Sequence, residues 1–325
     1  MLGSALLWLA SSSTTLARGP LGAREADYQL AISQAYQRYQ SDTTGKIAEP
    51  IAGLPALATH YAVVIVRVDG KIWEQGDARV PFVLAAMAAP FTAALAAEQR
   101  GPELLNSTAG AVAGTAPVPP GRTVADWGPA PNMAFGAEGS IATLGLVQPQ
   151  HDADAKWRAL MQNFNRFAGA ELSVNDRAYH GEPPLAARVP QLTRELASDG
   201  RLQDDVDPTA DLYLRQSAVS VTARDLAIMA ATLANDGVNP VDRKMVVKPE
   251  VAQAIQSQLL APRKGSSTWM SKAGIAASAG ISGGIFVVVP GRLGIAVYAP
   301  PLDASGVSMR GQKAIKYLSQ ALMFP

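Results

Sequence analysis

The chain has 325 residues, of which 48% are apolar and 17% are charged, and its formal net charge is +1. This length and apolar content are enough for one large hydrophobic core or two smaller ones, and the near-neutral charge argues against binding to nucleic acid. Because there is no cysteine, disulfides, thiolate catalysis and cysteine-ligated zinc are excluded. His60, His151 and His180 lie far apart without the spacing of metal ligands, so we expect no metal and no cofactor.

Residues 1–17 contain an apolar run from Leu2 to Ala10, followed by small residues that end in Thr15-Leu16-Ala17. This pattern is typical of a signal peptide, but no lysine or arginine precedes the run, so a disordered N-terminus is the alternative. The localisation therefore stays open between cytoplasmic and periplasmic or secreted. The run is too short to span a bilayer and no later segment is apolar for long enough, so we expect no membrane association.

Two regular patterns open the folded part of the chain. From Ala26 to Tyr39, apolar residues recur at three- and four-residue steps, which predicts an amphipathic helix. Residues 61–68 are rich in β-branched side chains, Asp69-Gly70 is a two-residue turn signal, and residues 71–74 follow as the partner strand. These residues therefore predict a helix followed by a β-hairpin.

An alanine-rich helix is predicted over residues 83–99, with Pro90 in its first turns or at a kink. Residues 101–136 are rich in Pro, Gly, Ala and Ser without periodicity, which predicts a long irregular segment. Thr222 and Asp225 form a capping box at the start of a later helix. The later helical patterns lie at residues 141–147, 153–167, 185–197, 222–235, 249–260 and 309–322, and strands return at residues 285–289 and 293–298.

Strands near both chain ends, with helices between them, do not fit a βαβ repeat. They predict an α+β fold, in which one antiparallel sheet is built from both chain ends, flanked by helices, with an inserted helical domain. The expected division is a sheet subdomain of residues 26–100 plus 265–325 and a helical subdomain of residues 101–264, whose long Pro/Gly-rich loop covers residues 101–136.

Several segments together carry a family resemblance. They are Gly45-Lys46-Ile47-Ala48, Val68-Asp69-Gly70, Pro81-Phe82, Arg224-Asp225-Leu226-Ala227, Gly283-Gly284-Ile285 and Pro300-Pro301-Leu302-Asp303. Over about residues 40–315 the chain resembles the penicillin-binding and class A β-lactamase architecture and, within it, the glutaminase family. The resemblance implies a β-lactamase-like fold and, as the family reaction, hydrolysis of L-glutamine to L-glutamate and ammonia.

The resemblance also implies a Ser-x-x-Lys pair, in which the lysine takes the serine proton so that the serine attacks the side-chain amide of glutamine. Aligned from Pro81-Phe82, these two positions hold Ala86 and Ala89, and neither methyl group transfers a proton. The lysine of a second family element, Lys-Ser-Gly, aligns with Ser278. We therefore expect a degenerate active site without the catalytic pair.

The substrate-binding positions of the family are only partly retained. Glu182 and Tyr213 match a glutamate and a tyrosine of the family, whereas Val189 and Ala137 replace asparagines, and a further tyrosine falls near Arg263. The amide of Ile281 corresponds to the one that forms an oxyanion hole with the amide of the nucleophile, and backbone amides survive the loss of side chains. The candidate pocket positions are Ala86, Ala137, Glu182, Val189, Tyr213, Arg263 and Ile281.

Three functions remain open from the sequence. We expect a pseudoenzyme that binds a small amino acid or amide, or that acts as a partner in a homo-oligomer such as a dimer or tetramer. The first alternative is an active amidohydrolase with a relocated nucleophile, Ser278 or Ser282, although no lysine or histidine is visibly placed to activate either one. The second is a structural partner of an active homologue, in which Glu182 and Tyr213 are an ordinary solvated carboxylate and a packing aromatic.

Overall fold

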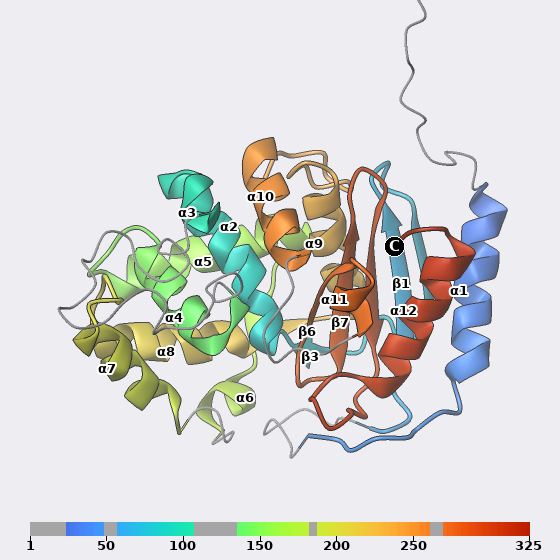
Figure 1. The fold of residues 1–325 in the computed structure, drawn as a ribbon, viewed down its shortest axis with the longest axis horizontal. Helices are drawn as coiled ribbons and strands as arrows, with labels where there is room; N and C mark the ends of the chain where they lie inside the picture. The colour runs from blue at the N-terminus through green and yellow to red at the C-terminus, as the bar shows by residue number, and fades with distance from the viewer. Residues whose placement is uncertain (1–23, 49–56, 107–134, 182–186, 261–268) are drawn as a thin grey trace, which may run out of the picture.

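The computed structural model describes residues 24–48, 57–106, 135–181, 187–260 and 269–325. Its main sheet has five antiparallel strands in the order β2-β1-β8-β7-β6, so the two ends of the chain pair with each other (Figure 1). The prediction of one antiparallel sheet built from both chain ends is therefore confirmed. The strands are β1 (Ala62–Arg67), β2 (Ile72–Gly76), β6 (Ala276–Ala279), β7 (Gly284–Val289) and β8 (Leu293–Tyr298).

Apart from Arg67 at the end of β1, the three central strands are apolar along their length because helices cover both faces of the sheet. On one face, Val63 and Ile295 pack with residues of α1 (Glu25–Tyr39) and α12 (Met309–Ala321). On the other face, Val64 and Ala296 pack with α9 (Ala223–Ala234). Figure 1 shows this order of layers, with α1 and α12 on the outside.

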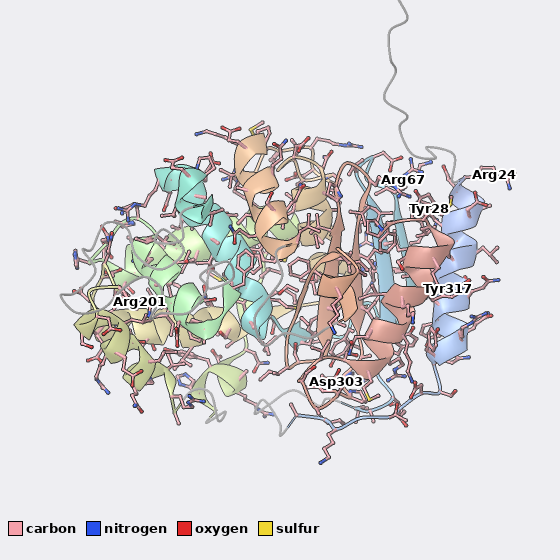
Figure 2. All side chains as sticks on the ribbon, in the orientation of Figure 1. Arg24, Tyr28, Arg67, Arg201, Asp303 and Tyr317 are labelled. Carbon is pink, nitrogen blue, oxygen red and sulfur yellow. The ribbon has the colours of Figure 1, made fainter. Side chains whose placement is uncertain are left out.

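Two close contacts attach the covering helices to the sheet. A Cβ atom on Gly294 of β8 would lie 2.2 Å from the backbone nitrogen of Ala231, so glycine is what allows α9 to approach this closely. On the opposite face, Tyr28 of α1 stacks on Trp73 of β2 with ring centroids 4.8 Å apart. The guanidinium of Arg67 lies 5.4 Å from the centroid of the Tyr28 ring, at the end of β1 (Figure 2).

A second, three-stranded antiparallel sheet was not predicted. It consists of β3 (Phe82–Val83), β5 (Val219–Val221) and β4 (Ser173–Val174). The expectation that strands occur only near the two chain ends was therefore wrong. Strands of two or three residues are too short to give a periodicity signal, and only tertiary pairing defines them.

The predicted helices are present with shifted ends. Those at α5 (Ala153–Ala168), α9, α10 (Pro249–Leu260) and α12 are confirmed to within a few residues, and the capping box of Thr222 and Asp225 is formed. α4 (Ala137–Leu146) starts four residues earlier than expected, and α7 (Val189–Ser198) starts four residues later. Four helices were missed: α3 (Glu103–Asn106), α6 (Asp176–His180), α8 (Val206–Ser217) and α11 (Trp269–Lys272).

Helices α3 to α8 lie on the side of the sheet away from α1 and α12 (Figure 1). The subdomain boundaries at residues 100 and 264 stay a prediction, while α3 corrects the prediction of an entirely irregular segment over residues 101–136. Residues 1–17 and most of that segment lie outside the described residues. Among the described helices, none is both long and apolar enough to cross a membrane.

Candidate functional site

The segment from Phe82 to Ala94 connects the small sheet to the helix on which the family pair would lie. After β3, the helical segment begins with the 3-10 turn η1 (Ala85–Ala88) and continues as α2 (Ala89–Arg100), with Pro90 in the first turn as predicted. Within this segment only Ala86 is exposed, and Ala89 is buried. The predicted nucleophile position is thus the one residue of the segment whose side chain reaches solvent.

The backbone around Ala86 is held in an unusual conformation. Ala85 has φ of +49°, in the left-handed region that residues other than glycine rarely adopt. Leu84 donates its N–H to the carbonyl of Val219 and accepts from Met87, so the start of the helix is fixed by hydrogen bonds on both sides. The N–H of Ala86 donates to no described residue, as expected at the first turn of a helix, where N–H groups lack intrahelical acceptors.

The turn between β6 and β7 lies against this helix start. The N–H of Gly283 donates to the carbonyl of Gly280 at 3.0 Å, which closes a four-residue turn around Ile281. Ile281 is 41% exposed, and its N–H has no acceptor in the described parts of the chain. A Cβ on Gly284 would lie 2.5 Å from Cε of Met87, so the missing side chain allows the turn to pack closely against the residue that follows Ala86.

Tyr213 lies on α8, which packs against η1. Gln216, one helical turn further on, accepts a buried hydrogen bond of 2.7 Å from the hydroxyl of Thr92 on α2. Residues three apart share a helix face, so Tyr213 is on the face of α8 that is turned toward η1 and α2. It is 5% exposed, no described residue hydrogen bonds to its hydroxyl, and burial alone raises its pKa.

The other predicted positions are less closely connected to Ala86. Val189 is fully buried at the start of α7, and Ala137 is partly exposed at the start of α4. These helices pack against each other and against α8, and α8 in turn packs against η1. Glu182 and Arg263 lie outside the described residues. The structure therefore brings together Ala86, Ala89, Ile281 and the helix that carries Tyr213.

The two serines considered as relocated nucleophiles lie close by, on β6 and the β6–β7 turn. Ser278 is buried on β6 opposite Phe286, and the hydroxyl of Ser282 is buried without a hydrogen-bond partner among the described residues. No hydrogen bond in the described regions joins either hydroxyl to a lysine or histidine. A serine nucleophile needs such a base to remove its proton, and the described residues supply none for these two.

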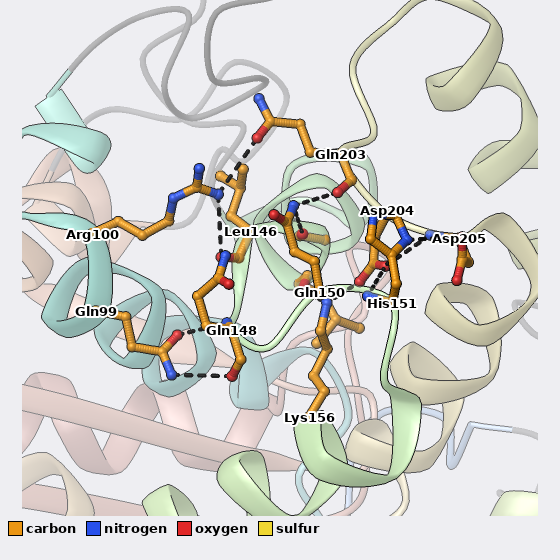
Figure 3. A network of polar contacts seen from close by, with 12 residues as sticks. Gln99, Arg100, Leu146, Gln148, Gln150, His151, Lys156, Gln203, Asp204 and Asp205 are labelled. Carbon is orange, nitrogen blue, oxygen red and sulfur yellow. Dashed lines mark hydrogen bonds and ion pairs between the residues drawn. The ribbon is translucent and has the colours of Figure 1, made fainter.

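A polar network that the sequence did not reveal connects the loop before α5 to the loop before α8 (Figure 3). At its centre the ammonium of Lys156 donates to the carboxylate of Asp204 and to the carbonyl of Leu144, 3.3 Å away. Asp204 also accepts from the backbone N–H groups of His151 and Asp205. The side chains of Lys156 and Asp204 are only 1% and 6% exposed, so the ion pair is buried.

Burial and hydrogen bonding act in opposite directions on this ion pair. Burial would raise the pKa of Asp204, but the hydrogen bonds from Lys156 and the two backbone N–H groups outweigh it, and the pKa is lowered. For Lys156, burial lowers the pKa and the hydrogen bond to Asp204 opposes that effect. Ligand atoms of His151, Asp204 and Asp205 lie within 4.8 Å of one another, yet Lys156 and the backbone already use the oxygens of Asp204. These three residues are therefore a poor metal site.

Comparison with known proteins gives consistent matches. A family model described as glutaminase matches residues 45–324. The glutaminase of Colwellia psychrerythraea (strain 34H) is 33% identical over 298 residues, which are 90% of this chain and 95% of that protein. Two glutaminases of Bradyrhizobium diazoefficiens are longer, and the chain spans about half of their length.

Solved structures agree with these sequence matches. A structure described as the probable glutaminase ybaS has a TM-score of 0.80 at 30% identity, covering 93% of this chain and 98% of that one. The structure of Mglu in its glutamate form has a TM-score of 0.78 at 28% identity and covers 94% of this chain and 69% of that one. The expected β-lactamase-like fold is confirmed, and glutamine hydrolysis is the reaction of the family concerned. The chain belongs to the glutaminase family.

Proposed function

We propose that this chain is a glutaminase-family protein that has lost the Ser-x-x-Lys pair and binds a small amino acid or amide without hydrolysing it. The observation that carries the proposal is the exposed methyl of Ala86 at the start of the site helix, with the buried methyl of Ala89 three residues later. Removal of a serine nucleophile or its base lowers turnover by on the order of 10⁶ in serine hydrolases. Here both groups are absent, and Ser278 replaces the second lysine as well.

The binding part of the proposal is supported by the polar groups that remain. The N–H groups of Ala86 and Ile281 do not depend on side chains, and neither donates to a described residue. Ala85, which directly precedes Ala86, has a rare left-handed conformation, and strained residues of this kind cluster at ligand sites. Among the similar structures, Mglu is described in a glutamate form, which supports an amino acid of this class as the ligand.

Two measurements on the purified protein test the proposal. Ammonia release from L-glutamine should stay at the level of a no-enzyme control, and a thermal-shift titration with L-glutamine and L-glutamate should raise the melting temperature with ligand concentration. Catalytic turnover that disappears in Ser278→Ala or Ser282→Ala would establish the relocated nucleophile instead. A melting temperature that changes with neither ligand would contradict the binding role and leave a structural partner as the function.

Assembly is a separate part of the proposal. We propose that the chain forms a homo-oligomer, or a hetero-oligomer with an active homologue, since a protein without turnover acts only through what it binds. Light scattering on the purified chain gives the mass of the assembly directly. A monomeric mass at all accessible concentrations, together with no co-elution with an active glutaminase from the same source, would contradict this part alone.

A further inference from the structure

We propose that Asp303 is a positioning residue for the ligand site, because its carboxylate fixes the loop of residues 303–307 beside the exposed side chain of Ile281. In this arrangement the loop forms one wall of the site at the β6–β7 turn. The assignment rests on the proposed function, in which a ligand binds at this turn and at Ala86. It adds a wall from the segment that follows β8, which contains none of the candidate pocket positions.

The β6–β7 turn and the segment after β8 are packed against each other. Ala299 donates its N–H to the carbonyl of Gly283 at 3.0 Å. A Cβ on Gly283 would lie 2.5 Å from Cα of Pro300, so glycine is what allows this close approach. Further along the segment, a Cβ on Gly306 would lie 3.9 Å from Cγ2 of Ile281, which is an ordinary van der Waals distance. The loop therefore lies beside the side chain of Ile281, which is 41% exposed.

A single carboxylate organises the loop, which precedes α12 (Figure 2). Oδ1 of Asp303 accepts from the N–H and the hydroxyl of Ser305, at 2.8 and 2.6 Å, and from the N–H of Val307 at 3.1 Å. Oδ2 accepts from the side-chain amide of Gln312 at 2.8 Å, which ties the loop to α12. The backbone of Asp303 adds two bonds, donating to Val307 and accepting from Gly306. The shape of the loop beside Ile281 thus depends on one side chain.

The charge state of Asp303 suits this role. Burial would raise its pKa, but the hydrogen bonds from Ser305, Gln312 and Val307 outweigh that effect, and the pKa is lowered. The side chain therefore stays a carboxylate at neutral pH, and both of its oxygens remain acceptors. The Oδ1 atom of an asparagine accepts hydrogen bonds in the same way, whereas alanine offers no acceptor. Asp303→Asn is therefore the matched control for Asp303→Ala.

The test titrates L-glutamate and L-glutamine into the wild type and both variants by isothermal titration calorimetry. Since Asp303→Ala loses several hydrogen bonds of the loop, we expect its dissociation constant to rise about tenfold, while that of Asp303→Asn stays within about twofold of wild type. Melting temperatures of the ligand-free proteins are measured alongside, because a purely structural role would lower them without changing the dissociation constant.

The outcomes separate this inference from the proposed function. A folded Asp303→Ala protein with the wild-type dissociation constant overturns the inference and leaves the proposed binding function intact. An equal loss of affinity in Asp303→Asn overturns the role of the Oδ1 contacts. Absence of binding of either ligand by the wild type overturns both the inference and the proposed function.

A second measurement does not depend on the folding of the Asp303 variants. The chain has no cysteine, so Ala304→Cys places one environment-sensitive dye on an exposed residue of the loop. We expect its emission to change with ligand and to saturate at the dissociation constant found by calorimetry. An emission that stays constant at saturating ligand overturns the inference.

Lys244→Cys provides the matched control for the label. The Lys244 side chain is 79% exposed, and the neighbouring Arg243 hydrogen bonds to the carbonyls of Val68 and Asp69, at the end of the sheet opposite the β6–β7 turn. Emission from this position should not respond to the ligand. Equal responses at the two positions would indicate a change throughout the molecule and would overturn the assignment of a wall to residues 303–307.

Discussion

Replacement of Asp204 by asparagine tests the buried ion pair with Lys156. The two side chains are 6% and 1% exposed, and without the carboxylate charge the ammonium keeps only neutral acceptors such as the carbonyl of Leu144. Loss of one partner of a buried pair costs about 3–5 kcal/mol of unfolding free energy. The loss at pH 7 cannot exceed about 5 kcal/mol, because Lys156 can lose its proton instead of staying charged. Its ordinary pKa is 10.5, and each pH unit between 7 and that value costs about 1.36 kcal/mol.

The pH dependence distinguishes this mechanism from a packing defect. If Lys156 is neutral in the folded Asp204→Asn variant and protonated when unfolded, the unfolded state binds more protons and stability rises with pH. The difference in unfolding free energy between wild type and Asp204→Asn should therefore shrink by up to about 1.4 kcal/mol per pH unit from pH 7 toward 10. Urea unfolding at several pH values measures it. A deficit below about 1 kcal/mol, or one that does not change with pH, would refute the reasoning.

Lys156→Met is the matched control. It removes the ammonium and leaves Asp204 with the backbone N–H groups of His151 and Asp205 as donors. We therefore expect a smaller loss than in Asp204→Asn, since the remaining charge keeps hydrogen-bond partners. When both substitutions are combined, no buried charge is left, and the double variant should be more stable than Asp204→Asn alone.

Three further predictions concern the site helix, the sheet and a surface ion pair. Ala86→Ser combined with Ala89→Lys should give no glutaminase turnover, because the second lysine of the family is still absent; sustained ammonia release would contradict this. Gly294→Ala should cost at least about 3 kcal/mol, since its Cβ would lie 2.2 Å from the backbone of α9, and an unchanged melting temperature would contradict it. The hydrogen bond from Lys313 lowers the pKa of Asp42 from 3.8 to about 2, so stability should fall as pH drops through that interval, and less in Asp42→Asn. Acid unfolding curves of wild type and Asp42→Asn that coincide would contradict the last prediction.

Several features of the fold follow from the sequence because they depend on local pattern. The hairpin around Asp69-Gly70, the capping box of Thr222 and Asp225, and the amphipathic helix of residues 25–39 are each defined by residues close together in the chain. α8 was missed although it is twelve residues long, because its first turn contains Pro208 and acidic residues that resemble a loop. The short strands of the second sheet were missed because their definition depends on partners more than forty residues away.

The sequence by itself determined that positions 86, 89 and 278 hold alanine, alanine and serine, and no fold changes those side chains. Only the tertiary structure decided which groups meet. The turn of Ile281 packs against the start of the helix at Ala86 because Gly280 and Gly284 have no side chains that would collide with Met87. Lys156 pairs with Asp204, which lies forty-eight residues away in the chain. Contacts between distant segments depend on how the helices and the sheet pack, and that packing leaves no periodic pattern in the sequence.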